Sequence, residues 1–106
     1  MEEIVLVLTT FPENFDAASL ARDLVEGRMA ACVSVLPPQT STYRWNGAIE
    51  TAREHQVVIK TISSRVGELS MTLRTRHPYD LPELLILTVS GGDPSYLDWV
   101  RGSSRL

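Results

Sequence analysis

The dipeptide Asn46-Gly47 lies between two extended segments and constrains the fold of this chain more than any other feature. A two-residue type I′ turn needs positive φ at both central positions, and asparagine followed by glycine meets that need best. The sequence therefore predicts a β-hairpin with arms at residues 40–45 and 48–62. The second arm is too long for the core of a small domain to cover, so we expect its outer part to be solvated or paired with another subunit.

The first arm continues an earlier extended segment, residues 31–36, from which it is separated by Pro37-Pro38. Proline cannot donate a hydrogen bond to a sheet ladder. The pair therefore predicts a kink, a bulge or a change of strand partner at this point.

Residues 4–10 form a continuous apolar run, which predicts a central strand that Phe11-Pro12 should end. A helix should follow, capped by Asn14 or Asp16. Apolar residues at helical spacing define its buried face: Ala17, Leu20, Ala21, Leu24 and Val25.

A second helix is expected to begin at a cap provided by Ser63 or Ser64 and to end at His77-Pro78, because the residue before proline is pushed out of the helical region. The residues at helical spacing along one of its faces are Val66, Leu69, Leu73 and His77. Residues 84–89 predict a buried strand. Asp93-Pro94 is typical of the start of a last helix, and the tail from Gly102 is expected to be frayed.

The predicted order is β-α-β-β-α-β with an additional C-terminal helix. This order is typical of the α+β ferredoxin-like fold, in which helices cover one face of an antiparallel sheet. With 106 residues, 43% of them hydrophobic, the chain is expected to form one domain over residues 1–106. Many unrelated functions share this fold, so the order of elements does not choose among them.

Ten Lys and Arg residues against thirteen Asp and Glu give a net charge of −3. Nucleic-acid binding is not expected, because it depends on a basic face that neutralises phosphates. A membrane span is not expected either, since no apolar run approaches about 20 residues. The acidic start of the chain and the single cysteine, Cys32, indicate a cytoplasmic protein with a reduced thiol.

Catalytic chemistry finds little support in the sequence. A nucleophile needs a neighbouring base, and His55 and His77 are the two imidazoles present. Cys32 lies in a small apolar stretch, where an inert buried thiol is expected. The first strand is not followed by a glycine-rich phosphate loop. We therefore expect a protein that is not an enzyme.

Metal binding would need residues from several segments, because no CxxC, HxxxH or HExxH spacing occurs. His77 is the best single candidate ligand, since it lies where a helix ends in a loop. Its alternative role is to stabilise the helix C-terminus. His55 is expected to be a solvated surface residue. Four carboxylates could join such a site: Glu50, Glu54, Asp80 and Glu83.

Four aromatic residues are placed unusually: Tyr43 and Trp45 beside the hairpin turn, Tyr79 after His77-Pro78, and Trp99 in the last helix. A tryptophan beside a tight turn has little core to fill. It indicates contact with another chain or a ligand pocket. The alternative is that Trp45 packs on the last helix of its own chain.

Several segments together resemble the CutA divalent-cation-tolerance family. The strongest is His77-Pro78-Tyr79-Asp80-Leu81-Pro82-Glu83, which is similar to the family's His-Pro-Tyr-x-x-Pro-Glu motif. The other similar segments are Tyr43-Arg44-Trp45-Asn46-Gly47 with Ile49-Glu50, Ala30-Ala31-Cys32-Val33, Lys60-Thr61, and Gly92-Asp93 with Tyr96-Leu97 and Trp99. These matches span nearly the whole chain.

The resemblance implies a homotrimer whose long hairpins pair across subunits, with an architecture similar to the PII signalling proteins. It also implies a role in tolerance to copper and other divalent metals, without an assigned reaction. In some members, copper binding is placed on a first-strand cysteine and on two adjacent histidines. The matching positions here are Thr9, Arg76 and His77, so weaker or rearranged Cu²⁺ binding is expected.

Two functions remain open at this point. One is a trimeric metal-binding or metal-tolerance protein that uses His77 and nearby carboxylates. The other is a trimeric module that binds a small effector or a protein partner, with Lys60 meeting an anionic ligand. Its intersubunit clefts would be lined by Tyr43, Trp45, Glu50, Lys60, Tyr79, Glu83 and Trp99.

Overall fold

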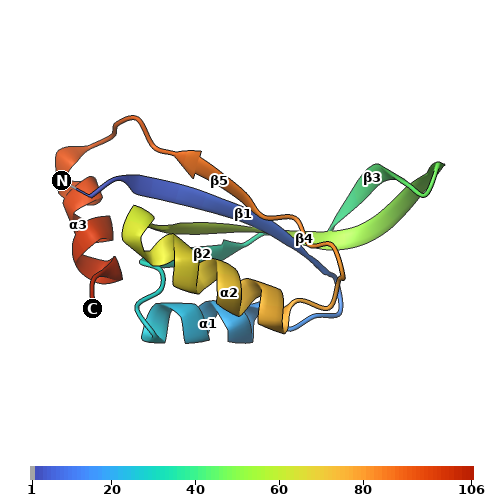
Figure 1. The fold of residues 1–106 in the computed structure, drawn as a ribbon, viewed down its shortest axis with the longest axis horizontal. Coiled ribbons are helices and arrows are strands. Elements are labelled where there is room, and N and C mark those ends of the chain that lie inside the picture. The colour runs from blue at the N-terminus through green and yellow to red at the C-terminus, as the bar shows by residue number, and fades with distance from the viewer. Residues whose placement is uncertain (1) are drawn as a thin grey trace.

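The computed structural model describes residues 2–106, which form an α+β domain (Figure 1). Five strands, one 3₁₀ turn and three α-helices follow one another in this part of the chain. Their bounds are β1 (Ile4–Pro12), α1 (Ala17–Glu26), β2 (Cys32–Val35), β3 (Gln39–Trp45), β4 (Ala48–Ile62), η1 (Ser63–Arg65), α2 (Val66–Arg76), β5 (Leu85–Thr88) and α3 (Pro94–Ser104).

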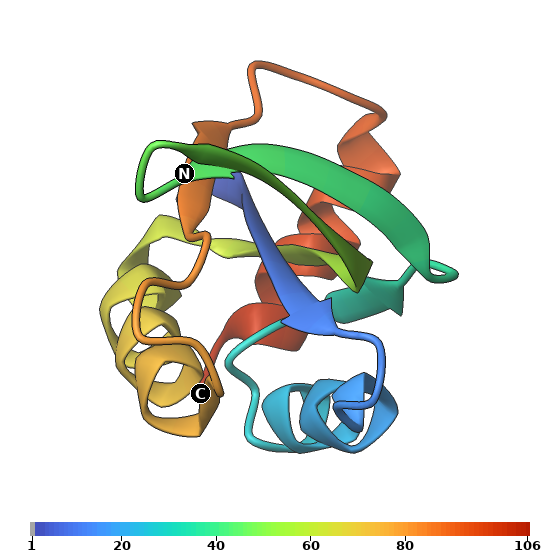
Figure 2. The same ribbon diagram turned by 90° about the vertical axis from the view of Figure 1, so that its right-hand side faces the viewer.

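All strand pairs are antiparallel, and the sheet has the order β2-β4-β1-β5, with β3 pairing to the outer half of β4. Strands β2 and β3 both pair with β4, on either side of Pro37-Pro38, so the predicted interruption at the prolines is confirmed. Helices α1 and α2 lie next to each other on one face of the sheet, and α3 lies at the end away from the hairpin (Figure 1, Figure 2). The predicted ferredoxin-like arrangement is confirmed.

The hairpin between β3 and β4 turns at Asn46-Gly47 as predicted. Both residues have positive φ, 49° and 80°, and the register runs from Gln39 opposite Glu54 to Trp45 opposite Ala48. Strand β1 ends opposite Glu54, so the outer part of β4 pairs with β3 alone. The hairpin therefore projects beyond the helices, in a molecule 44 Å long and 26 Å by 24 Å across (Figure 1).

The main core lies between the sheet and the pair α1 and α2. Alternate residues of β1 and β4 face the helices, since side chains along a strand point to opposite faces in turn. The buried side chains include Val5, Val7, Phe11, Leu20, Leu24, Val57, Ile59, Leu69 and Leu73. Each fully buried side chain of this size stabilises the fold by about 1.5–3 kcal/mol. A second cluster forms beneath α3 from Ile4, Ala31, Ile62 and Val100.

Strand β1 is longer than predicted, because Phe11-Pro12 continues it instead of ending it. Phe11 pairs with His55 of β4 and is fully buried in the main core, and Pro12 is opposite Glu54 at the last position of the ladder. Proline is tolerated there, since few ladder bonds remain to be made at a strand end.

The cap of α1 is Asp16, whose Oδ1 accepts a hydrogen bond from the Ser19 amide at 3.1 Å. The cap expected for α2 at Ser63 or Ser64 is wrong. These residues belong to η1, and α2 begins after Arg65 without a side-chain cap. The Ser63 hydroxyl instead donates to Glu2 Oε2 at 2.9 Å, which ties η1 to the start of the chain.

Strand β5 is shorter than predicted and is not buried in the single chain. Leu85, Ile86 and Leu87 expose 52%, 49% and 44% of their surface. The reason is topological. Strand β5 pairs on one side with β1 and forms an edge of the sheet, and a sequence of apolar residues cannot distinguish an edge strand from a central one.

Helix α3 begins as predicted, with Asp93 accepting from the Tyr96 amide at 3.1 Å and Pro94 in the first turn. The prediction of a frayed tail from Gly102 is wrong, because α3 continues to Ser104, which is buried. The Arg28 guanidinium donates to the carbonyls of Gly102 and Arg105 at 3.2 Å and 2.7 Å, and so satisfies carbonyls at the helix end. Within residues 2–106, no helix has the length and apolar character needed to cross a membrane.

Candidate functional site

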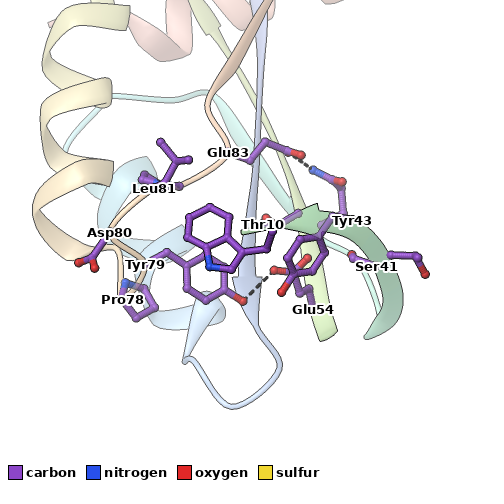
Figure 3. Close-up of a pocket in the computed structure, with 13 residues that line it drawn as sticks. Thr10, Ser41, Tyr43, Glu54, Pro78, Tyr79, Asp80, Leu81 and Glu83 are labelled. Atoms are coloured by element: carbon purple, nitrogen blue, oxygen red, sulfur yellow. Dashed lines mark hydrogen bonds between the residues drawn. The ribbon is translucent and has the colours of Figure 1, made fainter. Parts of the chain in front are cut away.

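A cleft of about 790 Å³ opens where the hairpin, the end of β1 and the loop between α2 and β5 meet (Figure 3). Its walls combine aromatic rings, carboxylates and small polar groups. They include Thr10 from β1, Tyr43 and Trp45 from β3, Glu54 and Gln56 from β4, and Tyr79, Asp80 and Glu83 from the loop.

His77 fixes the start of that loop. It ends α2 with an extended backbone, as expected before Pro78. Its Nε2–H donates to the Thr10 carbonyl at 2.7 Å, and its Nδ1 accepts from the Tyr79 amide at 3.1 Å. The ring also stacks on Phe11, with 4.3 Å between centroids. A carbonyl can only accept and an amide can only donate, so these contacts select the neutral Nε2–H tautomer.

Burial lowers the pKa of His77, which also favours the neutral ring, although the hydrogen bond to Thr10 acts in the opposite sense. A metal ligand needs a nitrogen lone pair that is free. In this conformation the Nδ1 lone pair is used by the Tyr79 amide and Nε2 carries the proton. The arrangement therefore gives His77 a role in holding the loop, and its role as a metal ligand stays a prediction.

The other two positions that the resemblance implies as copper ligands, Thr9 and Arg76, have other surroundings. Thr9 is fully buried in the sheet, and Arg76 forms an ion pair with Asp23 of α1 at 2.7 Å. Across residues 2–106, no group of three or more His, Cys, Asp or Glu side chains is close enough to hold a metal ion.

Glu54 lies beside the cleft with only 7% of its surface exposed. The Tyr79 hydroxyl donates to its Oε2 at 2.7 Å (Figure 3). Burial and this hydrogen bond hold the pKa of Tyr79 well above its usual value, so the phenol stays neutral and remains a donor. The pair joins the loop to β4.

Gln56 makes a second connection between the loop and the sheet. Its Nε2 donates to Glu83 Oε2 at 2.8 Å and to the Thr9 carbonyl at 2.9 Å. Glu54 and Gln56 point to the same side of β4 because they are two residues apart. Glu54 is one of the four carboxylates that the sequence offers as candidate ligands, and Gln56 is not predicted as a site residue. The alternation along the predicted strand was the signal that could have paired them.

The residues predicted to line an intersubunit cleft divide into two groups. Tyr43, Trp45, Tyr79 and Glu83 line the cleft of the single chain. Glu50 is paired with Tyr43 on the hairpin but is not among the lining residues.

Lys60 and Trp99 belong to the other end of the sheet, beside Tyr96 of α3. Lys60 Nζ donates to the Tyr96 hydroxyl at 3.1 Å, a bond that raises the pKa of Lys60, and the rings of Tyr96 and Trp99 lie 5.6 Å apart. Within one chain, these two side chains therefore contribute nothing to the cleft.

Trp45 does not pack on α3, because the hairpin and α3 lie at opposite ends of the molecule (Figure 1). It borders the cleft and remains 47% exposed. His55 is half-buried and not simply solvated, since its Nδ1–H donates to the Leu36 carbonyl at 2.7 Å. Cys32 lies on β2 opposite Lys60. It is half-buried, whereas the sequence predicts a buried thiol.

The topology and the cleft define a class of small α+β proteins with a ferredoxin-like sheet, a projecting hairpin and a loop held by a histidine. The model of the CutA1 divalent ion tolerance protein family matches residues 5–103. The chain belongs to this family, whose role is tolerance to divalent cations.

Individual relatives agree with this assignment. The divalent-cation tolerance protein CutA of Pectobacterium atrosepticum is 46% identical over 103 residues, covering 97% of this chain and 94% of the relative. The crystal structure of CutA from Xylella fastidiosa is 42% identical with a TM-score of 0.90, covering 96% of this chain and 98% of that one. A CutA structure from Synechococcus elongatus PCC7942, complexed with a Bis-Tris molecule, is 40% identical with a TM-score of 0.86, covering 97% and 95%.

Proposed function

We propose that this protein acts in divalent-cation tolerance as a cytoplasmic homotrimer without a catalytic reaction. The observation that carries the proposal is the exposed edge of β5, where Leu85, Ile86 and Leu87 are each about half exposed. An unprotected apolar edge strand is a template for pairing with another chain. Proteins that keep such an edge in their fold normally cover it.

The projecting hairpin is the complementary feature. Its side chains Trp45 and Ile49 are exposed, and among the strands of residues 2–106 the segment of β4 from Ala48 to Arg53 pairs with β3 alone. When the hairpin of one copy contacts the sheet edge of the next, the contact is heterologous, and such contacts close into a ring when the rotation between copies allows it. A ring of three matches the trimer that the family resemblance implies, with an architecture similar to the PII proteins.

Light scattering tests the assembly directly. A homotrimer has three times the subunit mass of 11.8 kDa, and the result should hold across protein concentrations used for binding studies. A mass equal to one subunit would contradict the proposal, because the apolar edge would then be stable in water without a cover.

Metal binding is the second part of the proposal, with Cu²⁺ or another divalent cation as the partner. The divalent-cation tolerance family supports metal binding, and the hydrogen bonds of His77 limit how a metal could bind there. A metal at His77 would displace either the Tyr79 amide from Nδ1 or the proton from Nε2. Calorimetric titration of Cu²⁺ into the wild type and His77→Ala decides the question, since identical isotherms would remove His77 from the account.

A second candidate function is the binding of a small effector, which the cleft itself favours. Ligand sites are usually concave, largely apolar and equipped with a few fixed polar groups. Tyr43, Trp45 and the pair Tyr79–Glu54 provide these elements in one place. A thermal-shift screen of small metabolites tests it, because a ligand that binds the folded state raises its melting temperature. A clear metal response with no metabolite response would count against it.

A further inference from the structure

The cleft has a charge that decides which ligands it favours. Three carboxylates line it, those of Glu54, Asp80 and Glu83, and none of its thirteen lining residues is a lysine or an arginine. Within one chain, Lys60 contacts Tyr96 near α3 and does not line this cleft. A concave surface lined by charges of one sign raises the local concentration of ions of the other sign. The cleft therefore favours cations over anions.

Its aromatic rings narrow the class of cation. Tyr43, Trp45 and Tyr79 all border the cleft, and the first two are exposed. The face of an aromatic ring attracts a cation whose centre lies within about 6 Å, and sets of such rings recognise alkylated ammonium groups. A compact divalent ion would instead need several oxygen ligands at close range. No such group of side chains is found in residues 2–106.

Glu54 supplies the fixed charge. It is nearly buried, and the Tyr79 hydroxyl holds one of its oxygens at 2.7 Å, so its position does not depend on the ligand. A carboxylate can accept further hydrogen bonds beyond the one from Tyr79. Charge interactions are also stronger where water is partly removed. A cation in the cleft would thus meet a carboxylate already held in place.

We propose that this cleft binds a small organic cation of the alkylammonium class, with Tyr43, Trp45 and Tyr79 contacting its alkyl groups and Glu54 and Glu83 balancing its charge. The inference rests on the proposed effector-binding function and deepens it by naming the ligand class.

The test compares two probes of the same shape and different charge. Choline is a quaternary ammonium ion, and 3,3-dimethylbutan-1-ol is its neutral carbon analogue. Both are titrated into the full chain at constant ionic strength and followed by amide chemical shifts. Choline should shift amides of β3, β4 and residues 77–83 in a saturable manner, and the neutral analogue should bind at least about tenfold more weakly. Equal binding of the two probes, or no binding of choline, overturns the proposal.

Three variants locate the site. Glu54→Gln keeps an acceptor for the Tyr79 hydroxyl but removes the charge, and should weaken choline binding about tenfold. Trp45→Leu keeps an apolar side chain but removes the ring, and should also weaken it. Glu26→Gln removes an exposed carboxylate on α1 and should leave binding unchanged. The proposal fails if Glu54→Gln and Trp45→Leu bind choline as the wild type does, or if Glu26→Gln weakens binding equally.

Light scattering on the same samples separates this inference from the assembly. A trimer that does not bind choline contradicts the inference and leaves the trimer standing. A monomer that binds choline with the expected variant pattern supports the inference and contradicts the trimer.

Discussion

The hydroxyl of Tyr79 donates a 2.7 Å hydrogen bond to the carboxylate of Glu54 and joins the loop after α2 to β4. Gln56 and Glu83 make a similar connection at the other end of the loop, at 2.8 Å. The shape of the cleft therefore depends on two polar contacts between segments far apart in sequence. Disturbing either one should affect both stability and ligand binding.

Removing the Tyr79 hydroxyl should destabilise the fold. Tyr79→Phe leaves the nearly buried Glu54 carboxylate without its donor, which should lower the free energy of unfolding by about 1–3 kcal/mol. The matched control is Tyr96→Phe, because Tyr96 is exposed and its contact with Lys60 lies at the surface. That change should cost less than about 1 kcal/mol. Urea unfolding at a fixed protein concentration measures both, and equal losses would contradict the role given to Glu54.

Stability should fall in mild acid because of His77. Burial lowers the pKa of His77 from its ordinary value of 6.5, so the unfolded chain takes up a proton at a higher pH than the folded chain. The stabilisation is therefore fully present above about pH 6.5 and is lost as pH falls below that value towards the folded pKa. In His77→Gln this part of the pH dependence should disappear.

His55→Gln is the control for that measurement and should keep the pH dependence of the wild type. Urea midpoints measured for the three proteins between about pH 5 and pH 7.5 provide the comparison. If His77→Gln loses stability with acid as steeply as the wild type does, the neutral His77 ring with its two hydrogen bonds is not the source of the pH dependence.

A charge on the edge strand should prevent assembly. Leu87→Glu places a carboxylate on β5 where the side chain is about half exposed, so the subunit should still fold while the proposed contact is disrupted. Light scattering should then give a mass near the 11.8 kDa of one subunit. Met71→Glu, on the exposed side of α2, should leave the trimer intact. A trimeric Leu87→Glu would show that β5 is not the contact.

The hairpin turn should be sensitive to a single methyl group. Gly47 has φ of 80°, a region that costs other residues about 1–2 kcal/mol, so Gly47→Ala should destabilise the protein by about 1 kcal/mol. Gly67 lies in α2 with open space around an added Cβ, and Gly67→Ala should stabilise by about 0.5–1 kcal/mol. Thermal or urea unfolding shows whether each variant is more or less stable than the wild type. A change in stability in the same direction for both variants would contradict the prediction.

Local features of the fold could be predicted from the sequence because each depends on the backbone conformation of a few neighbouring residues. The turn at Asn46-Gly47, the interruption at Pro37-Pro38 and the helix caps Asp16 and Asp93 are all present as predicted. The end of α2 before Pro78 belongs to the same group. The order of these elements was enough to predict the ferredoxin-like topology.

Much of the candidate site was decided only by the tertiary structure. The sequence placed Tyr79 and Glu83 in one loop, but burial of Glu54 depends on that loop folding back over β4. Lys60 is predicted to line an intersubunit cleft, and within one chain the pairing of the strands places it near α3, away from the cleft beside the hairpin. His77 is a candidate metal ligand in the sequence, and only the fold shows that neighbours from β1 and the loop use both of its ring nitrogens. Contacts between distant segments leave no local pattern in the sequence, because they are set by how the elements pack.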